Sequence, residues 1–327
     1  MSTNIKNKPL GNIIMTNFTF AFPGQGSQSV AMLADLAETF PVVIDTYQEA
    51  SEALGYDLWE LVQQGPAEAL NQTDKTQPAL LTASVAIWRV WAQQGGEKPS
   101  VVAGHSLGEY SALVCAGVID FKDAVKLVEL RGQLMQQAVP AGVGAMYAII
   151  GLDDAAIAQA CEKAAEGEVV SPVNFNSPGQ VVIAGNKAAV ERAGVLCKEA
   201  GAKRALPLPV SVPSHCALMK PAAEKLAVAL QNIEFKTPEI AVINNVDVIA
   251  ETNAEKIKDA LVRQLFCPVR WTEIITKMAA DGISLQIEAG PGKVLSGLVR
   301  RIDKSFTAQA INDTATLKAA LAAVKGE

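Results

Sequence analysis

Histidine and cysteine are scarce in this chain of 327 residues. Its 5 cysteines lie far apart without paired spacing, and with only 2 histidines they form no recognisable zinc pattern. Cysteines used in this way fit a reducing compartment, so we expect a cytoplasmic protein with no bound metal. The scarcity of histidine also means that any imidazole base must be His105 or His215.

Positive charge is also limited, because 28 lysines and arginines stand against 34 aspartates and glutamates, for a net charge of −6. We therefore expect neither a nucleic acid nor a membrane surface as a partner. No segment approaches an uninterrupted membrane span, and residues 1–14 have no apolar core of signal-peptide length. An acidic partner would have to meet a local cluster of basic residues.

Hydrophobic residues make up 50% of the chain, which is enough for a packed core. Two apolar runs, residues 18–22 and 99–106, are each followed by a helical pattern. This repetition of strand and helix predicts a parallel sheet with helices on both faces. The expected helices of this part cover residues 29–40, 78–95, 109–117 and 121–138.

The pattern changes at Gly144, where strands and helices follow the order β-α-β-β-α-β of a ferredoxin-like domain. The expected strands are residues 144–151, 169–175, 180–185 and 203–210, with helices at 153–165 and 186–201. A strand at 240–245, a helix at 254–266 and a strand at 284–292 then resume the first pattern. We predict a discontinuous large α/β domain, residues 16–139 and 208–327, a small inserted domain, residues 140–207, and an N-terminal extension, residues 1–15.

The segment GHSLG, residues 104–108, matches the G-x-S-x-G pattern of a nucleophile elbow. A predicted strand precedes it and a predicted helix follows it, as the motif requires. A sharp turn strains the backbone of Ser106, and bulky residues two positions away would clash. The N-terminus of the following helix would direct the amide of Leu107 at an oxyanion. Ser106 is therefore the predicted nucleophile, rather than an ordinary turn serine.

A serine hydroxyl needs a base, and His105 is adjacent to Ser106. Its ring should project away from the serine oxygen at a sharp turn, so a turn-stabilising role is expected for it. His215, in the loop that follows the small domain, is the predicted base. Cys216 is a weak alternative nucleophile because no turn presents it. No aspartate or glutamate stands out as the third member of a triad.

Arg131 interrupts the apolar face of the predicted helix at 121–138. An inward guanidinium is costly unless it meets an anion. Two interpretations are open: a structural ion pair with a carboxylate of the protein, or a fork that binds the carboxylate of a substrate.

The glycine-rich segment FPGQGSQ, residues 22–28, is not a nucleotide-binding loop. Ser29 stands where a dinucleotide fingerprint has its third glycine, and the lysine of a P-loop is missing. Beside the catalytic turn, this loop could supply a second backbone N–H to an oxyanion.

These residues together resemble the malonyl-CoA:acyl carrier protein transacylase family. The resemblance runs from Phe18 onward, and Tyr147, where a small residue is common, is a minor departure from it. The matching segments, in order, are GQGSQ, TQPALL, GHSLGEY, LRGQLMQ, NFNSPGQVVIAG, VPSHCALM, LFCPVRW and IEAGPGKVL.

The resemblance implies an α/β fold with an α/β-hydrolase-like large domain and a ferredoxin-like insert. It implies a dyad of Ser106 and His215, in which the main-chain carbonyl of Gln264 orients the histidine and replaces the missing acid. The amides of Gln25 and Leu107 would form the oxyanion hole. The remaining implied site residues are Arg131, which would bind the malonyl carboxylate, and Gln77, Met135, Asn174, Asn176 and Val294, which would line the cleft.

The implied reaction moves malonyl from malonyl-CoA to the phosphopantetheine thiol of acyl carrier protein, for fatty acid biosynthesis. It needs no redox or metal cofactor, and a monomer is expected. A serine esterase or thioesterase is the main alternative, but such an enzyme has no use for an inward arginine. A non-catalytic partner-binding module is a second alternative, against which the presence of Ser106 and His215 speaks.

Carrier proteins of this kind are acidic, so their docking needs basic residues near the mouth of the cleft. Two basic pairs lie close in sequence to expected cleft residues, although each of them could also be an ordinary solvated charge. The pairs are Lys203 with Arg204 and Arg300 with Arg301.

Overall fold

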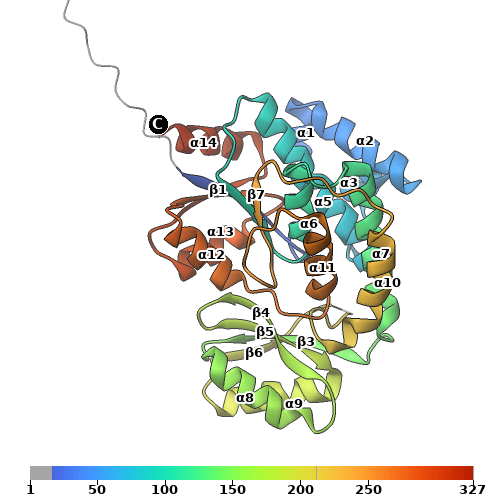
Figure 1. The fold of residues 1–327 in the computed structure, drawn as a ribbon, viewed down its shortest axis with the longest axis vertical. Helices are drawn as coiled ribbons and strands as arrows, with labels where there is room; N and C mark the ends of the chain where they lie inside the picture. Colours follow the sequence, from blue (N-terminus) through green and yellow to red (C-terminus); the bar gives the residue numbers. More distant parts are fainter. Residues whose placement is uncertain (1–16, 211, 327) are drawn as a thin grey trace, which may run out of the picture.

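The computed structural model describes residues 17–210 and 212–326, and the predicted extension at residues 1–15 lies outside them. A five-stranded sheet forms the centre of the large part of the molecule (Figure 1). Neighbouring strands pair in parallel throughout this sheet. In spatial order its strands are β7 (Ala241–Ile243), β2 (Val101–Gly104), β1 (Phe18–Phe22), β8 (Leu285–Ala289) and β9 (Thr307–Ile311).

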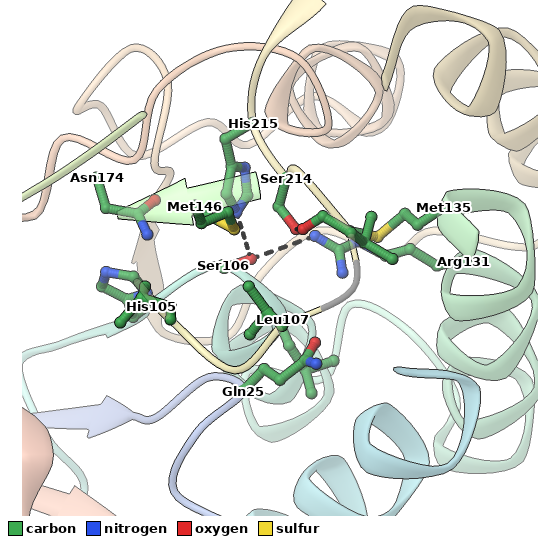
Figure 2. A pocket seen from close by; sticks show the side chains of 13 residues that line it. Gln25, His105, Ser106, Leu107, Arg131, Met135, Met146, Asn174, Ser214 and His215 are labelled. Atoms are coloured by element: carbon green, nitrogen blue, oxygen red, sulfur yellow. Dashed lines mark hydrogen bonds between the residues drawn. The ribbon is translucent and has the colours of Figure 1, made fainter. Parts of the chain in front are cut away.

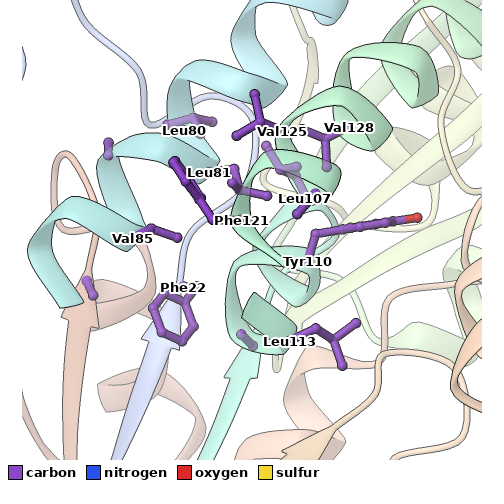
Figure 3. Close-up of a cluster of buried hydrophobic side chains, with 14 of the residues drawn as sticks. Phe22, Leu80, Leu81, Val85, Leu107, Tyr110, Leu113, Phe121, Val125 and Val128 are labelled. Carbon is purple, nitrogen blue, oxygen red and sulfur yellow. The ribbon is translucent and has the colours of Figure 1, made fainter. Parts of the chain in front are cut away.

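The two faces of this sheet bury different side chains because residues alternate along a strand. Phe18, Phe20 and Phe22 of β1 belong to one large apolar cluster, part of which Figure 3 shows between the sheet and its helices. Ala21 belongs to a second cluster on the opposite face. The helices that contribute to the first cluster include α5 (Thr73–Gln93), α6 (Leu107–Cys115) and α7 (Phe121–Ala138), and those of the second are α12 (Trp271–Ala280) and α13 (Val294–Ile302).

Further helices surround these layers and complete the large part. They are α1 (Ala34–Thr39), α2 (Val42–Leu54), α3 (Leu58–Gln64), α4 (Ala67–Leu70), α10 (Lys220–Leu230), α11 (Ala254–Gln264) and α14 (Thr314–Lys325), with a short 3₁₀ turn, η1, at Ala217–Met219. Within the two described ranges, none of the helices has the length and apolar character needed to cross a bilayer.

A second, four-stranded sheet is antiparallel throughout, and helices α8 (Asp154–Ala165) and α9 (Lys187–Glu199) cover its outer face (Figure 1). Its strands, in spatial order, are β4 (Val170–Ser177), β5 (Gln180–Asn186), β3 (Gly144–Ile150) and β6 (Arg204–Pro207). The predicted mixed fold, a parallel sheet plus a ferredoxin-like unit, is confirmed. The exact limits given for the two domains remain a prediction.

The inner face of the small sheet packs toward the large part of the molecule. Met146 and Val182 of this face belong to one apolar cluster with Cys216, which follows the predicted base. Strand β4 is joined to the large part through Val269, whose N–H donates to the carbonyl of Val173 and whose carbonyl accepts from the N–H of Phe175. The small sheet therefore faces the large part of the molecule, and the site lies where the two parts meet.

Tyr147 has a local structural explanation. A Cβ atom at Gly194 of α9 would lie 3.1 Å from Cδ2 of the Tyr147 ring. The glycine thus leaves room for the large side chain at this position of β3.

Candidate active site

The turn between β2 and α6 holds Ser106 in a strained backbone conformation, with φ 52° and ψ −109°. A Cβ atom at Gly104 would lie 1.8 Å from the carbonyl carbon of Gly108. A Cβ atom at Gly108 would lie 1.9 Å from the carbonyl oxygen of Phe22. Both glycines are therefore required by close backbone approach, as the sequence predicts.

Asn245 holds this turn in place from the other side of the strand. Its Oδ1 accepts from the N–H of Ser106 at 2.7 Å, and its Nδ2 donates to the carbonyl of Gly104 at 2.7 Å. The asparagine follows β7, so it lies at the carboxyl end of the parallel sheet, where ligands of such sheets bind.

His215 lies beside the serine, with Nε2 2.8 Å from the Oγ of Ser106 (Figure 2). Its Nδ1 is 2.6 Å from the carbonyl oxygen of Gln264. A carbonyl oxygen only accepts, so Nδ1 carries the hydrogen and Nε2 is free to accept the serine proton. Burial and the charge of Arg131 lower the pKa of His215 to about 3, which keeps the ring neutral. The histidine is thus oriented as a base by a main-chain carbonyl rather than by an acid.

His105 takes the other direction, as expected. Its Nε2 is 2.8 Å from Oδ1 of Asn176, and its ring lies 5.6 Å from that of Trp271 between centroids. The residue therefore packs the turn against the small sheet and α12, away from the serine oxygen.

Arg131 points from α7 into the site and is 1% exposed (Figure 2). Its Nη1 donates to Oε1 of Gln77 at 2.8 Å, and its Nη2 donates to Oε1 of Gln264 at 3.0 Å and to Oγ of Ser106 at 3.3 Å. Among the described residues no carboxylate lies within ion-pair distance of it, and its buried Nε has no hydrogen-bond partner. The interpretation as a structural ion pair is therefore wrong, and the guanidinium is available to an incoming carboxylate.

A cleft opens above these groups, and it is lined by strands of the small sheet and by loops and helices of the large part. The inner cleft is lined by Gln25, His105, Ser106, Leu107, Arg131, Met135, Met146, Asn174, Leu208, Val210, Val212, Ser214 and His215. It continues into an outer cleft, which shares Gln25, His105, Asn174 and Leu208 with it and adds, among others, Asn176, Gln180, Ala148, Val182 and Val294.

The predicted oxyanion-hole and cleft residues, with the exception of Gln77, line one or both parts of this cleft. Gln25, Leu107, Met135 and Asn174 line the inner cleft, while Asn176 and Val294 line the outer one. Gln77 lines neither cleft. It is 1% exposed, and its Oε1 accepts from Nη1 of Arg131. Leu107 is the first residue of α6, so its N–H has no acceptor within the helix and can face the cleft.

The predicted docking residues are all exposed. Nη1 of Arg301 donates to Oε1 of Gln180, an outer-cleft residue, at 2.6 Å. Arg204 of β6 pairs with Ile150 of β3, and Ile150 pairs on its other side with Gln180 of β5. Lys203 precedes Arg204, whereas Arg300 reaches the carbonyl of Ala308 in β9. Three of the four cations therefore lie toward one end of the small sheet.

The sequence did not predict two buried polar residues of the site, Glu109 and Asn245. Glu109 is 2% exposed, and its Oε2 accepts from Nε2 of Gln264 at 2.8 Å and from the N–H of Asn245 at 2.9 Å. Burial raises the pKa of Glu109 to about 7. The available signals were a glutamate within the apolar run LGEYSALV and a pair of asparagines directly after a strand.

Within residues 17–210 and 212–326, no cluster of three or more metal-binding side chains occurs.

Comparison with known proteins agrees with this geometry. The acyl transferase domain family matches residues 19–319. The malonyl CoA-acyl carrier protein transacylase of Escherichia coli K12 is 69% identical over 307 residues, which cover 94% of this chain and 99% of the relative.

Two solved structures are similar in fold as well as in sequence. An acyl carrier protein S-malonyltransferase from Vibrio cholerae has 73% identity and a TM-score of 0.92, over 93% of this chain and 100% of that one. The structure of a type II PKS acyl-carrier protein in complex with its malonyl-transacylase matches with 67% identity and a TM-score of 0.93. The match covers 94% of this chain and 99% of that one. This chain therefore belongs to the malonyl CoA-acyl carrier protein transacylase family of acyl transferases.

Proposed function

We propose that this protein transfers a malonyl group from malonyl-CoA to the phosphopantetheine thiol of acyl carrier protein, in fatty acid biosynthesis. One observation supports this function above the others: Arg131 is buried without a carboxylate partner, and its Nη2 lies 3.3 Å from the nucleophilic oxygen of Ser106. A group bound there through its own carboxylate places its other end at the serine. Malonyl has this shape, because a carboxylate and a thioester flank one methylene.

In the first half of the reaction, the Oγ of Ser106 attacks the thioester carbonyl while Nε2 of His215 takes the serine proton. The amides of Gln25 and Leu107 would donate to the developing oxyanion. The carbon–sulfur bond then breaks, the coenzyme A sulfur takes the proton from His215, and a malonyl ester remains on the serine.

The second half reverses these steps with another thiol. The phosphopantetheine sulfur gives its proton to Nε2 of His215 and attacks the malonyl ester of Ser106. The ester bond breaks, Ser106 recovers its proton from His215, and the malonyl thioester leaves on the carrier protein. Each half returns the dyad to its starting protonation state, as a ping-pong exchange requires.

This chemistry needs no redox or metal cofactor, and we propose none. We also propose a cytoplasmic monomer that acts on malonyl-CoA and carrier protein and binds neither nucleic acid nor membrane. The net charge of −6 supports the last point. The relative that was solved with an acyl-carrier protein supports the choice of partner.

The test is intact-protein mass spectrometry after incubation with malonyl-CoA. We expect one added malonyl group that persists in buffer and leaves when free pantetheine is supplied. Ser106→Ala should acquire none while unfolding at the temperature of the parent, because the hydroxyl contributes little to packing. An adduct that water removes as fast as pantetheine does would indicate a thioesterase, and a full adduct on Ser106→Ala would refute the nucleophile.

A further inference from the structure

The buried carboxylate of Glu109 takes no part in the steps above, yet it lies directly beneath the nucleophile. It belongs to α6, three residues after Ser106, in a run that is otherwise apolar except for small or aromatic hydroxyls. We propose that Glu109 is a positioning residue that fixes the side-chain amide of Gln264 and, through it, the guanidinium of Arg131. This inference rests on the proposed malonyl transfer.

The contacts run in sequence from Glu109 to the substrate end of the site. Oε2 of Glu109 accepts from Nε2 of Gln264 at 2.8 Å. Oε1 of the same glutamine accepts from Nη2 of Arg131 at 3.0 Å. All three side chains are buried, at 2%, 0% and 1% exposure, so water competes little for these bonds.

The direction of the Gln264 amide follows from the groups at its two ends. Its Nε2 meets three acceptors, which are Oε2 of Glu109 at 2.8 Å, the carbonyl of Ser106 at 3.1 Å and Oδ1 of Asn245 at 3.5 Å. Its Oε1 meets Arg131, which only donates. A rotated amide would oppose oxygen to oxygen at one end and N–H to N–H at the other. Glu109, the nearest of these acceptors, therefore favours the orientation that gives Arg131 an acceptor.

The role of Glu109 is that of an acceptor through Oε2, whether or not its other oxygen carries a proton. Oε2 receives two N–H donors, from Gln264 and from the backbone of Asn245, and so it must remain the unprotonated oxygen. A glutamine at this position could present its carbonyl oxygen to the same two donors. A methionine of similar length could not.

The base is oriented by a different contact, and this separation makes the inference testable. The main-chain carbonyl of Gln264, not its side chain, orients His215. Loss of the amide link should therefore impair binding of the malonyl carboxylate more than the chemistry at the serine. The readout is the ratio of malonyl to acetyl loading of Ser106, measured from the same two acyl-CoA substrates in each variant.

We expect Glu109→Met to lower this ratio by about tenfold, because the Gln264 amide would no longer hold Arg131 in position for its charge-assisted bond to the malonyl carboxylate. Glu109→Gln should keep the ratio within about twofold of the parent, because its carbonyl replaces the acceptor. The matched control is Glu251→Gln, since Glu251 lines the same small internal cavity as Glu109 but contacts neither Gln264 nor Arg131. Its ratio should not change.

A double-mutant cycle tests whether Glu109 acts through Gln264. Gln264→Met should lower the ratio by the same factor as Glu109→Met, and the double variant should lower it no further. Additive effects of the two changes would overturn the inference. So would an unchanged ratio in either folded single variant, and the second variant keeps the test valid if Glu109→Met does not fold. Failure of the parent protein to load malonyl at all would instead refute the proposed function.

Discussion

At the scale of the residue, the site depends on a buried cation whose terminal nitrogens donate only to neutral oxygens. Gln77 and Gln264 each offer Arg131 a carbonyl oxygen, which supports the guanidinium without neutralising its charge. A carboxylate of the protein in the same place would compete with the substrate. The two glutamines thus keep the cation buried and still attractive to an anion.

Replacement of Arg131 by alanine should change substrate choice rather than abolish the chemistry. We expect malonyl loading to lose about 2 to 5 kcal/mol of transition-state stabilisation, because a buried carboxylate would lack its partner, while acetyl loading changes little. Stopped-flow or quenched acylation with both acyl-CoA substrates measures this difference. Lys126→Ala, on the exposed side of the same helix, is the control. Equal losses for malonyl and acetyl would show that Arg131 only supports the fold.

A second prediction at this scale concerns the charge of His215. Because its pKa is lowered to about 3, we expect the ring to stay neutral at pH 6, with its hydrogen on Nδ1. Nitrogen NMR of the imidazole reports both features, and His105→Gln assigns the signals. A titration near pH 6.5 with both nitrogens protonated below it would contradict this geometry.

The same pKa has a consequence for stability, whose sign is fixed by linkage. The unfolded histidine has a pKa of about 6.5, so below that pH the unfolded chain binds a proton that the native site excludes. The stabilisation associated with a neutral His215 is therefore complete above about pH 6.5 and is lost as the pH falls. Chemical denaturation of the parent and of His215→Gln at pH 5 and pH 7.5 should show a smaller pH effect in the variant.

The sequence predicted the residues of the site that belong to motifs, and it missed those that depend on distant packing. Ser106 and its flanking glycines are recognisable in the sequence because the turn constrains neighbouring positions. Glu109 contacts Asn245 and Gln264, which lie 136 and 155 positions away along the chain. Only the folded sheet brings these residues together, so no local spacing could reveal them.

At the scale of the element, agreement between sequence and structure follows periodicity. Helix α7 has the predicted bounds, Phe121–Ala138, because its apolar face repeats without interruption apart from Arg131. The helix expected at residues 29–40 begins only at Ala34, because Ala31 and Leu33 adopt positive φ. Strand β9 was not predicted, since TAQAI is short and not strongly apolar. Pairing with β8 defines that strand.

Helices α5 and α7 pack closely at Gly132, and this contact allows a prediction about how the two helices are held together. A Cβ atom at Gly132 would lie 2.6 Å from Cα of Asp74, so Gly132→Ala should push the helices apart. We expect a loss of about 1 to 3 kcal/mol in the free energy of unfolding, and slower malonyl loading because Gln77 and Arg131 separate. Denaturant titration and acylation kinetics measure the two effects.

The control for this substitution is Gly297→Ala in α13, where the added Cβ would meet no atom within 4 Å outside the nearby backbone of its own helix. There, alanine should stabilise the protein by up to about 1 kcal/mol, through its higher helix propensity. If both variants behave alike, helix propensity rather than the approach of α5 and α7 decides the outcome.

At the scale of the whole molecule, the net charge is negative and the expected partner is acidic, so docking requires a local patch of positive charge. Arg301, Arg204 and Lys203 lie toward the end of the small sheet that borders the outer cleft, whereas Arg300 reaches toward β9. Such a cluster can steer an acidic carrier protein even when the rest of the surface repels it.

Reversal of all four cations to glutamate should slow malonyl transfer to acyl carrier protein by at least about tenfold at low salt. Loading from malonyl-CoA and transfer to free pantetheine should remain nearly unchanged, because neither needs the docking surface. Steady-state kinetics with the two acceptors, at low and high ionic strength, make the comparison. An equal loss with free pantetheine would indicate a damaged cleft, and no loss would place docking elsewhere.

The discontinuous order of the large sheet determines when this protein can act during its own synthesis. Strand β1 is made first but lies between β2 and β8, and β8 begins at Leu285. The serine emerges from the ribosome well before His215, and the carbonyl that orients the histidine belongs to Gln264. A nascent chain therefore carries its nucleophile long before it carries a working base, and it cannot consume malonyl-CoA until nearly all of it has been translated.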